Sequence, residues 1–407
     1  MSDSAAEILI LPPTTKRLKL DESENEDRLN DLPESVILHI LSFLNTKIAV
    51  QTCVLSTRWK DLWKRIPAAT LHSSNSRACK KFTKLVSKVL SLRDSSISLQ
   101  TLDYRGVHGN FEADVKRIVN YALSHNVQRL VLFINGDIAQ IPPSMFSCQT
   151  LTFLKLSIYH GDHETLFPKS LNLPALTNLQ LGNFTFGVDD NDRAEPFSKF
   201  NRLNSLLICN CTVTNALTLC ISSVTLVDLT IYNHKYNFYN IDLCTPNLCK
   251  LVFAGTPYQR LSGSNVSSLK HLDIDAAISP YKEEPPLILL SWLLELAEIK
   301  SLTVTPAALQ VLYFIPNLLK FNLPSLHNLK LLKLRMEEIF YGFRMTLRDT
   351  KLLTAKSKRE AARIRKAFKD GLELYHIPDG VVEFLLQNSP LAQVEFTVRR
   401  PYKEKRI

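Results

Sequence analysis

Hydrophobic residues follow two different periods along the chain, a helical one near the N-terminus and a strand-like one beyond residue 95. Between residues 36 and 44 they recur every three to four positions, which is the spacing of one helix face. Pro33 precedes them, and its fixed φ angle suits the first turn of a helix. We therefore expect a helix from Pro33, a second short helix over residues 49–54 and a third after Ser56.

The third expected helix carries two of the chain's three tryptophans. Its apolar residues are Trp59, Leu62, Trp63 and Ile66. A helical unit of about 40 residues is near the size at which a chain buries too little surface to be stable alone. We expect it to bury these side chains against the following domain or against a partner.

Strings of the form Leu-x-x-Leu-x-Leu then recur at intervals of about 26 residues, a period typical of leucine-rich repeats. The fourth position of each string is Leu102, Leu130, Leu154, Leu179, Leu206, Leu229, Leu251, Leu272, Leu302 and Leu332. The asparagine or cysteine that usually follows such a strand occurs only as Cys211, so the repeats should be irregular. We predict an α/β fold in which a three-helix N-terminal unit precedes an irregular solenoid of parallel strands, curved like a horseshoe.

Side chains alternate between the two faces of such strands, so the leucines mark the buried face and their neighbours mark the concave face. The neighbours that we nominate as target-binding candidates are Lys155, Gln180, Thr230, Tyr232, Asp273, Asp275, Thr303, Lys333 and Arg335. This set is mixed in polarity. It therefore favours a protein surface as the target over one small anion.

Composition and charge narrow the function. With 45% hydrophobic and 22% charged residues, the chain has the composition of a folded protein. Residues 348–370 carry nine basic and three acidic side chains, and residues 399–407 carry five and one, which together account for the whole net charge of +10. The basicity therefore belongs to a late segment and a tail, and not to a groove across the repeats.

The basic segment itself has helical spacing and predicts an inserted helix over residues 348–370. Its apolar face would hold Ala361, Ile364, Phe368 and Leu372. The cations that could contact phosphates are Arg363, Arg365, Lys366 and Lys369. A charge run is usually a solvated face, and the helical spacing already explains Phe368 as a core residue. Of the two binding interpretations, docking of an acidic protein surface ranks above nucleic-acid binding. A final strand unit at residues 391–396 should follow a loop and a short helix.

No sequence motif supports enzymatic chemistry or a bound cofactor. The chain lacks GxGxxG, GxSxG and HExxH strings, so no residue can be named as a nucleophile or a phosphate cradle. Cysteines are close in sequence at Cys209/Cys211 and Cys244/Cys249, but neither pair has the CxxC spacing of a zinc site. We expect reduced structural thiols, no metal and no cofactor.

Residues 1–28 are polar and mixed in charge, and we expect them to be disordered. Within them, Lys16, Arg17 and Lys19 belong to a string that resembles a nuclear localisation signal of the Pro-x-x-Lys-Arg-x-Lys-Leu-Asp type. The N-terminus lacks the apolar stretch of a secretory signal, and the apolar run at residues 287–297 is too short for a membrane span. We expect a nuclear protein, with the cytoplasm as the alternative location.

The N-terminal segment resembles a known domain over about 35 residues. Residues 32–44 match the pattern Leu-Pro-x-x-Val-Ile-x-x-Ile-Leu-Ser-Phe-Leu, and residues 49–63 match Ala-Val-x-Thr-Cys-Val-Leu-Ser-x-Arg-Trp-Lys-x-Leu-Trp. This resembles the F-box of plant F-box/leucine-rich-repeat proteins, and the C-terminal unit resembles part of their F-box-associated (FBD) region. The expected domains are a tail (1–28), the F-box (29–75), the repeats (76–345), and a basic helix with a C-terminal cap (346–407).

The resemblance implies that the F-box binds a Skp-family adaptor and, through it, the cullin and RING subunits of an SCF-type ubiquitin ligase. The implied adaptor-binding residues are Leu32, Pro33, Val36, Ile37, Ile40, Leu41, Leu44, Trp59, Leu62 and Trp63. Which of them contact the adaptor and which pack inside the F-box remains open at this point. The protein would be a substrate-recognition subunit that positions a target protein and has no catalytic residues of its own.

Two other interpretations remain open. In a non-ligase interaction scaffold, the F-box would only cap the solenoid, Trp59 and Trp63 would be buried inside the chain, and no adaptor would bind. In a nucleic-acid-binding protein, residues 348–370 would provide the affinity, which would depend steeply on salt.

Overall fold

The structure is a computed structural model, and it describes residues 29, 31–73, 79–106, 112–159, 161, 164–188, 193–233, 240–263, 266–277, 284–296, 298–323, 326–337, 341–353, 355–370 and 377–398. The predicted localisation signal and the basic tail lie outside these residues. The chain divides into two compact units, which we describe separately: unit 1 is Met1–Thr165 with Ser170–Leu176, and unit 2 is Leu166–Lys169 with Thr177–Ile407. Within the described ranges, every helix is too short or too polar to cross a bilayer.

Unit 1 opens with short helices, as predicted. Helix α1 (Glu34–Ser42) follows Pro33, and α2 (Thr46–Gln51) continues into the 3₁₀ helix η1 (Thr52–Val54). The expected third helix is instead two 3₁₀ helices, η2 (Thr57–Trp59) and η3 (Leu62–Arg65). A spacing of three residues between apolar positions fits a 3₁₀ turn as well as an α-helical one, so the pattern alone could not distinguish them.

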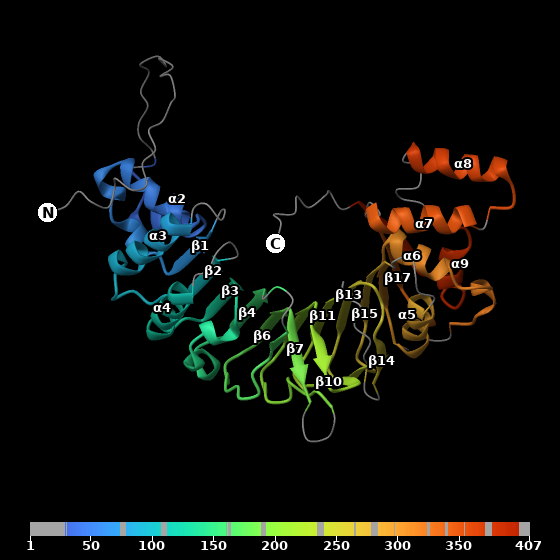
Figure 1. The fold of residues 1–407 in the computed structure, drawn as a ribbon, viewed down its shortest axis with the longest axis horizontal. Helices are drawn as coiled ribbons and strands as arrows, with labels where there is room; N and C mark the ends of the chain where they lie inside the picture. Colours follow the sequence, from blue (N-terminus) through green and yellow to red (C-terminus); the bar gives the residue numbers. More distant parts are fainter. Residues whose placement is uncertain are drawn as a thin grey trace, which may run out of the picture. The chain divides into compact units, whose positions relative to one another are not determined.

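Four parallel strands follow in unit 1, connected through two longer helices (Figure 1). In sheet order they are β1 (Ala68–His72), β2 (Thr101–Gly106), β3 (Arg129–Asn135) and β4 (Phe153–Tyr159). The connecting elements are α3 (Cys79–Leu92), α4 (Glu112–Ser124), η5 (Ile138–Gln140) and η6 (Pro143–Ser147). The buried Arg93 bonds the carbonyl oxygens of Ile66, Ile97 and Ser98 at 2.9 to 3.0 Å, which ties the N-terminal helices to this sheet.

Among its described residues, unit 2 contains eight further parallel strands of the same kind. In sheet order they are β6 (Asn178–Gly182), β8 (Ser205–Cys209), β11 (Asp228–Asn233), β13 (Lys250–Gly255), β15 (His271–Ala276), β16 (Ser301–Val304), β17 (Leu331–Met336) and β18 (Gln393–Val398). Strand β18 is an edge of this sheet, and all its side chains are exposed.

The ten leucines picked out by the repeat pattern all lie in these strands, and each is at most 2% exposed. Within each unit they are direct neighbours across adjacent strands; Leu102, Leu130 and Leu154 form one such row in unit 1. In unit 2 the row runs from Leu179 to Leu332 without a slip of register. This ladder confirms the predicted α/β fold with N-terminal helices and repeating parallel strands.

Repeat length decides what covers the other side of each strand. Leu251 and Leu272 are 21 residues apart, which leaves room only for a short strand, β14 (Arg260–Ser262). This strand forms a second sheet with β10 (Thr218–Ser222) and β12 (Asn240–Cys244). Strands β7 (Phe184–Gly187) and β9 (Thr212–Thr214) pair in the same way, with β5 (Thr165–Leu166) in their sheet. The 30 residues from Leu272 to Leu302, and again to Leu332, accommodate α5 (Glu284–Glu295) and then α6 (Pro306–Tyr313) with η7 (Leu318–Lys320).

The basic segment differs from its prediction. Instead of one helix over residues 348–370, the structure has α7 (Tyr341–Leu353) and α8 (Lys358–Lys369), which pack together (Figure 1). A variant of the capping box separates them: the Ser357 hydroxyl accepts the Glu360 N–H at 3.1 Å, and the Glu360 carboxylate accepts the N–H of Lys356, the residue before the cap, at 2.8 Å. Helix α9 (Val381–Leu386) and β18 then match the predicted short helix and final strand.

Candidate functional site

The N-terminal helices separate the predicted adaptor-binding residues into two groups. Five of them are buried inside unit 1: Ile37, Leu41, Trp59, Leu62 and Trp63. The other five are partly or fully exposed: Leu32, Pro33, Val36, Ile40 and Leu44. The first group can shape a binding surface from beneath, whereas only the second can contact a partner on this surface.

Exposed apolar side chains outside the predicted set enlarge this surface. Phe43 is 75% exposed, Val54 65% and Leu55 61%, and Ile48 is also exposed. These four residues were not predicted from the sequence as contact residues. The one available signal was at Phe43, which falls beside the apolar stripe of its helix and could therefore have been expected to be exposed. We call Val36, Phe43, Ile48, Val54 and Leu55 the apolar face.

Hydrogen bonds and ion pairs hold the elements that carry the apolar face. The Asn45 side chain accepts the Ile48 N–H at 2.9 Å and caps α2. The Arg58 guanidinium donates to the Leu32 carbonyl oxygen, and Arg65 pairs with Glu34 at the start of α1. These contacts fix the backbone under the exposed side chains, so a partner would meet a largely preformed surface.

Burial of Trp59 and Trp63 agrees with one part of the scaffold interpretation, in which the N-terminal helices only cap the repeats. The apolar face does not follow from that interpretation. A cap needs one apolar side toward the repeats and a polar side toward solvent. Large exposed apolar patches rimmed by polar residues usually mark an interaction site.

The nine target-binding candidates all lie on the strand face opposite the buried leucines, and each is at least partly exposed. In unit 2, five of them (Gln180, Thr230, Asp273, Thr303 and Lys333) lie in one row across neighbouring strands. Three residues that were not candidates, Leu207, Val252 and Glu395, complete this row. Tyr232 and Asp275 belong to the row beside it. Lys155 lies in unit 1, where its ammonium is 5.1 Å from the centre of the Phe133 ring.

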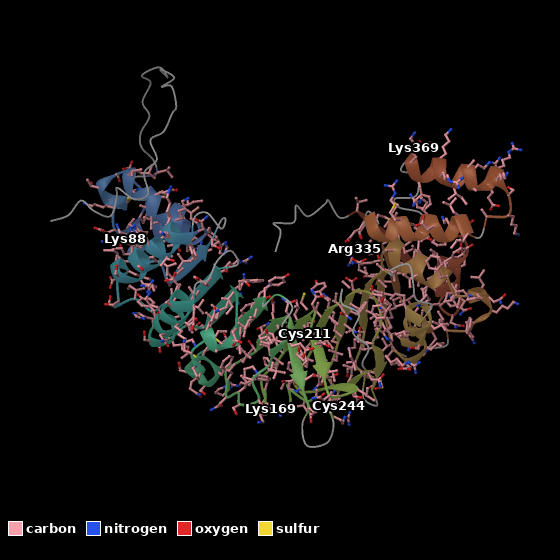
Figure 2. The ribbon with its side chains drawn as sticks, viewed as in Figure 1. Lys88, Lys169, Cys211, Cys244, Arg335 and Lys369 are labelled. Atoms are coloured by element: carbon pink, nitrogen blue, oxygen red, sulfur yellow. The ribbon has the colours of Figure 1, made fainter. Side chains whose placement is uncertain are left out.

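One candidate, Arg335, forms ion pairs with two others, Asp273 and Asp275; Figure 2 labels Arg335. The Arg335 guanidinium on β17 reaches over β16 to the Asp273 carboxylate, with contacts of 2.6 and 2.7 Å. It also pairs with Glu337 at 2.7 Å and lies 3.9 Å from Asp275. Burial lowers the pKa of Arg335, but Asp273, Glu337 and Asp275 outweigh this and raise that pKa above its usual value. We call these four residues the Arg335 network.

A smaller polar cluster occupies the same face of unit 1. The Asp103 carboxylate pairs with His72 at 3.1 Å and with Arg105 at 3.0 Å. Burial raises the pKa of Asp103, but hydrogen bonds from His72 and Arg105 outweigh it and hold that pKa below its usual value. The charged groups on both strand faces are thus partly satisfied within the chain.

A thiol cluster lies on the second sheet of unit 2, away from the strand face. The ligand atoms of Cys220, Asp242 and Cys244 lie within 4.8 Å of one another. Arg193 pairs with Asp242 and approaches the Cys220 sulfur at 3.5 Å, so a guanidinium already supplies positive charge here. Burial raises the pKa of Cys220 to about 12, which keeps this thiol protonated at neutral pH. The sequence had suggested Cys249 as the neighbour of Cys244, but the structure places Cys220 beside Cys244. Cys211 is buried in its repeat.

Comparison with known families agrees with both parts of this description. Residues 29–67 match the F-box domain, and residues 115–265 match the leucine-rich repeats described as "FBD-associated F-box protein At5g56370, LRR repeats". The chain thus combines an F-box with leucine-rich repeats. The apolar face lies within the F-box match, and α7 and α8 lie beyond both matches.

Similar proteins come from Arabidopsis thaliana. The FBD-associated F-box protein At3g52670 is 28% identical over 260 residues, which cover 61% of this chain and 55% of that protein. The putative F-box/FBD/LRR-repeat protein At4g13965 is 32% identical over 213 residues, 51% of this chain and 48% of its own length. The chain thus spans about half the length of these two relatives. The F-box/FBD/LRR-repeat protein At1g78750 is 25% identical over 400 residues, 91% of this chain and 84% of its own.

Proposed function

We propose that the chain is the substrate-recognition subunit of an SCF-type cullin–RING ubiquitin ligase, with the F-box bound to a Skp-family adaptor. The observation that carries this proposal is the apolar face. Its five side chains are exposed in unit 1, and their burial against an adaptor would remove apolar surface from water, which favours a complex. The match of residues 29–67 to the F-box domain supports the identity of the partner.

The proposed mechanism is positional. The F-box attaches the chain to the adaptor, and the adaptor connects it to the cullin and RING subunits and the ubiquitin-charged enzyme. The repeats hold a target protein, which raises the effective concentration of its lysines near that enzyme. In this mechanism the chain contributes binding energy and no catalytic group.

We propose that the target binds the strand face of the repeats. The row from Gln180 to Val252 alternates polar and apolar side chains and is flanked by the exposed Tyr232, a residue type enriched at binding hot spots. Next to it, the Arg335 network carries three carboxylates and one guanidinium. A target that presents basic residues beside an apolar contact would fit this end of the row.

Coexpression of the full chain with a Skp-family adaptor, followed by size-exclusion chromatography, tests the adaptor contact. The wild-type chain should co-elute with the adaptor. Phe43→Ser/Leu55→Ser should abolish co-elution and leave the chain folded, because both side chains are exposed. Leu217→Ser/Val224→Ser is the matched control, since these side chains are 79% and 69% exposed in unit 2, outside the F-box.

Equal co-elution of the wild type and the F-box double variant would contradict the assignment of the apolar face. A folded wild-type chain that never co-elutes with any adaptor tested would support the second candidate, a non-ligase interaction scaffold. Burial of Trp59 and Trp63 within unit 1 is the observation that favours the scaffold. In that case, the strand face would bind its target in the absence of an adaptor.

We also propose that the chain is imported into the nucleus through Lys16, Arg17 and Lys19, on the resemblance of this segment to a localisation signal. A fluorescent fusion of the full chain should accumulate in nuclei. Substituting all three residues with alanine should leave the fusion in the cytoplasm. Nuclear accumulation of the triple variant at the wild-type level would contradict the signal.

A further inference from the structure

Helices α7 and α8 form a basic cavity that the proposed ligase function does not use. It has a volume of about 480 Å³, within the range of ligand-binding pockets. Its lining is Arg344, Met345, Arg348 and Leu352 from α7, with Arg365, Phe368 and Lys369 from α8. Four cations thus surround a floor of three apolar side chains.

The cations on the α8 side of this cavity are exposed. Arg344 donates to the Phe368 carbonyl oxygen, and Arg348 pairs with Asp349 at 2.7 Å. Across the part of the chain that the structure describes, neither Arg365 nor Lys369 takes part in an ion pair, and both are exposed (Figure 2 labels Lys369). Glu360, the only acidic residue inside α8, is committed to the capping box.

The surrounding charge strengthens this imbalance. Residues 341–370 carry ten basic and three acidic side chains, so an approaching anion meets a positive field before it reaches the cavity. Arginine and lysine side chains bind carboxylates and phosphorylated groups through charge-assisted hydrogen bonds. The cavity is therefore complementary to an acidic ligand that also has an apolar part to cover the floor.

The floor favours a peptide over a nucleic acid. Phe368 is buried, and the Lys351 ammonium lies 5.8 Å from the centre of its ring, so one face of the ring is already near a cation. A base needs an open aromatic face for stacking. By contrast, an aliphatic or aromatic side chain of a peptide needs only apolar contacts, which Met345, Leu352 and Phe368 supply.

We propose that the cavity between α7 and α8 binds an acidic segment of a partner protein, with one apolar side chain on the floor and flanking carboxylates on Arg365 and Lys369. This site is separate from the F-box and from the strand face of the repeats. Its occupancy does not require the adaptor. Binding at this cavity can therefore be tested independently of the ligase function.

Fluorescence anisotropy with the full chain, without an adaptor, tests this site. The probe is a fluorescein-labelled peptide Glu-Asp-Glu-Phe-Asp-Glu-Asp at about 0.15 M salt, where long-range charge effects are screened beyond about 8 Å. Replacing its phenylalanine with serine should weaken binding about tenfold, because the apolar contact is lost. Leu352→Ala should reduce this difference between the two peptides.

Two pairs of cations on α8 provide a matched comparison. Arg365→Ala/Lys369→Ala removes two exposed cations of the cavity and should weaken binding about tenfold. Arg359→Ala/Arg363→Ala removes two exposed cations with the same spacing outside the cavity lining, and should weaken binding less than about threefold. Far-ultraviolet circular dichroism of both variants checks that the helices are intact.

Three results would overturn the proposal. Equal losses in both variants would show attraction to the overall charge of the helix. Equal affinity for the phenylalanine and serine peptides would show that the floor takes no part. A single-stranded oligonucleotide that binds more tightly than the peptide, and loses affinity in the Arg365/Lys369 variant, would assign the cavity to nucleic acid.

Discussion

The F-box and the repeat sheet of unit 2 expose their surfaces in opposite ways. The F-box exposes large apolar side chains, with Phe43, Val54 and Leu55 all more than 60% exposed. The strand face of unit 2 mixes polar residues with partly exposed apolar ones, and its charged members pair with one another, in the Arg335 network and between Lys333 and Glu395. An apolar patch gains free energy from any partner that covers it, whereas paired charges must exchange one set of contacts for another.

This difference suggests different kinds of binding. The apolar face suits a constant partner and a stable complex, as obligate interfaces are apolar. The strand face suits selective binding, because a target that leaves the partly exposed carboxylates or Arg335 unpaired would be rejected. One chain thus carries a surface suited to assembly and another suited to discrimination.

The largest effect on stability should come from a substitution in the interior of the F-box. Leu41→Ala removes a fully buried side chain and should lower the free energy of unfolding by about 2–5 kcal/mol, because it leaves a cavity. Urea denaturation of the full chain, followed by tryptophan fluorescence, measures this, since Trp59 and Trp63 are two of its three tryptophans. A loss below about 1 kcal/mol would show that Leu41 is not packed in a core.

The next largest effect should come from the Arg335 network. Arg335→Met keeps the side-chain length but leaves three carboxylates without their shared cation, and should cost about 2–3 kcal/mol. The double variant Arg335→Met/Asp273→Asn should recover part of this loss, because it removes one carboxylate. Denaturant unfolding of the three proteins gives both numbers; no recovery in the double variant would argue against a coupled network.

A smaller effect should appear at Asp103, and it should depend on pH. The pKa of Asp103 is lower in the folded chain than its usual value of 3.8, so its contribution to stability is present above pH about 4 and lost as pH falls through the folded pKa. Asp103→Asn should therefore destabilise the chain by about 1 kcal/mol at pH 7 and by less at pH 3. A difference that stays constant between these pH values would contradict the ionic role.

The smallest effect on stability should come from the apolar face. Phe43→Ser changes an exposed side chain, so the free energy of unfolding should change by less than about 0.5 kcal/mol. Thermal unfolding of the wild type and the variant tests this. A loss as large as that of Leu41→Ala would mean that Phe43 supports the fold and is not held available for a partner.

Much of the fold could be predicted from the sequence because burial in the repeats is periodic. The row of leucines from Leu179 to Leu332 follows from spacing alone, since each repeat buries equivalent positions. Where the local pattern is ambiguous, prediction failed. The three-residue spacing of apolar residues around Trp59 fits 3₁₀ and α-helical turns equally well. The helical period of residues 348–370 did not reveal the capping box that divides this segment into two helices.

The candidate surfaces were less predictable for a different reason. Strand alternation placed Asp273 and Arg335 on one face, but these residues are 62 positions apart and their contact depends on the register of three strands. The F-box pattern contained both buried and exposed apolar residues, and only the packing of the short helices separates Leu41 from Phe43. The α7–α8 cavity likewise requires two helices where the sequence suggested one.

The most direct test of the central claim is isothermal titration calorimetry of the full chain with a purified Skp-family adaptor. Tight binding is expected for the wild type and for Leu217→Ser/Val224→Ser. Phe43→Ser/Leu55→Ser should lose at least about 100-fold in affinity, since each anchor should contribute about 1.4 kcal/mol or more. Affinity that is unchanged in the F-box variant, or reduced equally in the control, would contradict the claim that the apolar face binds the adaptor.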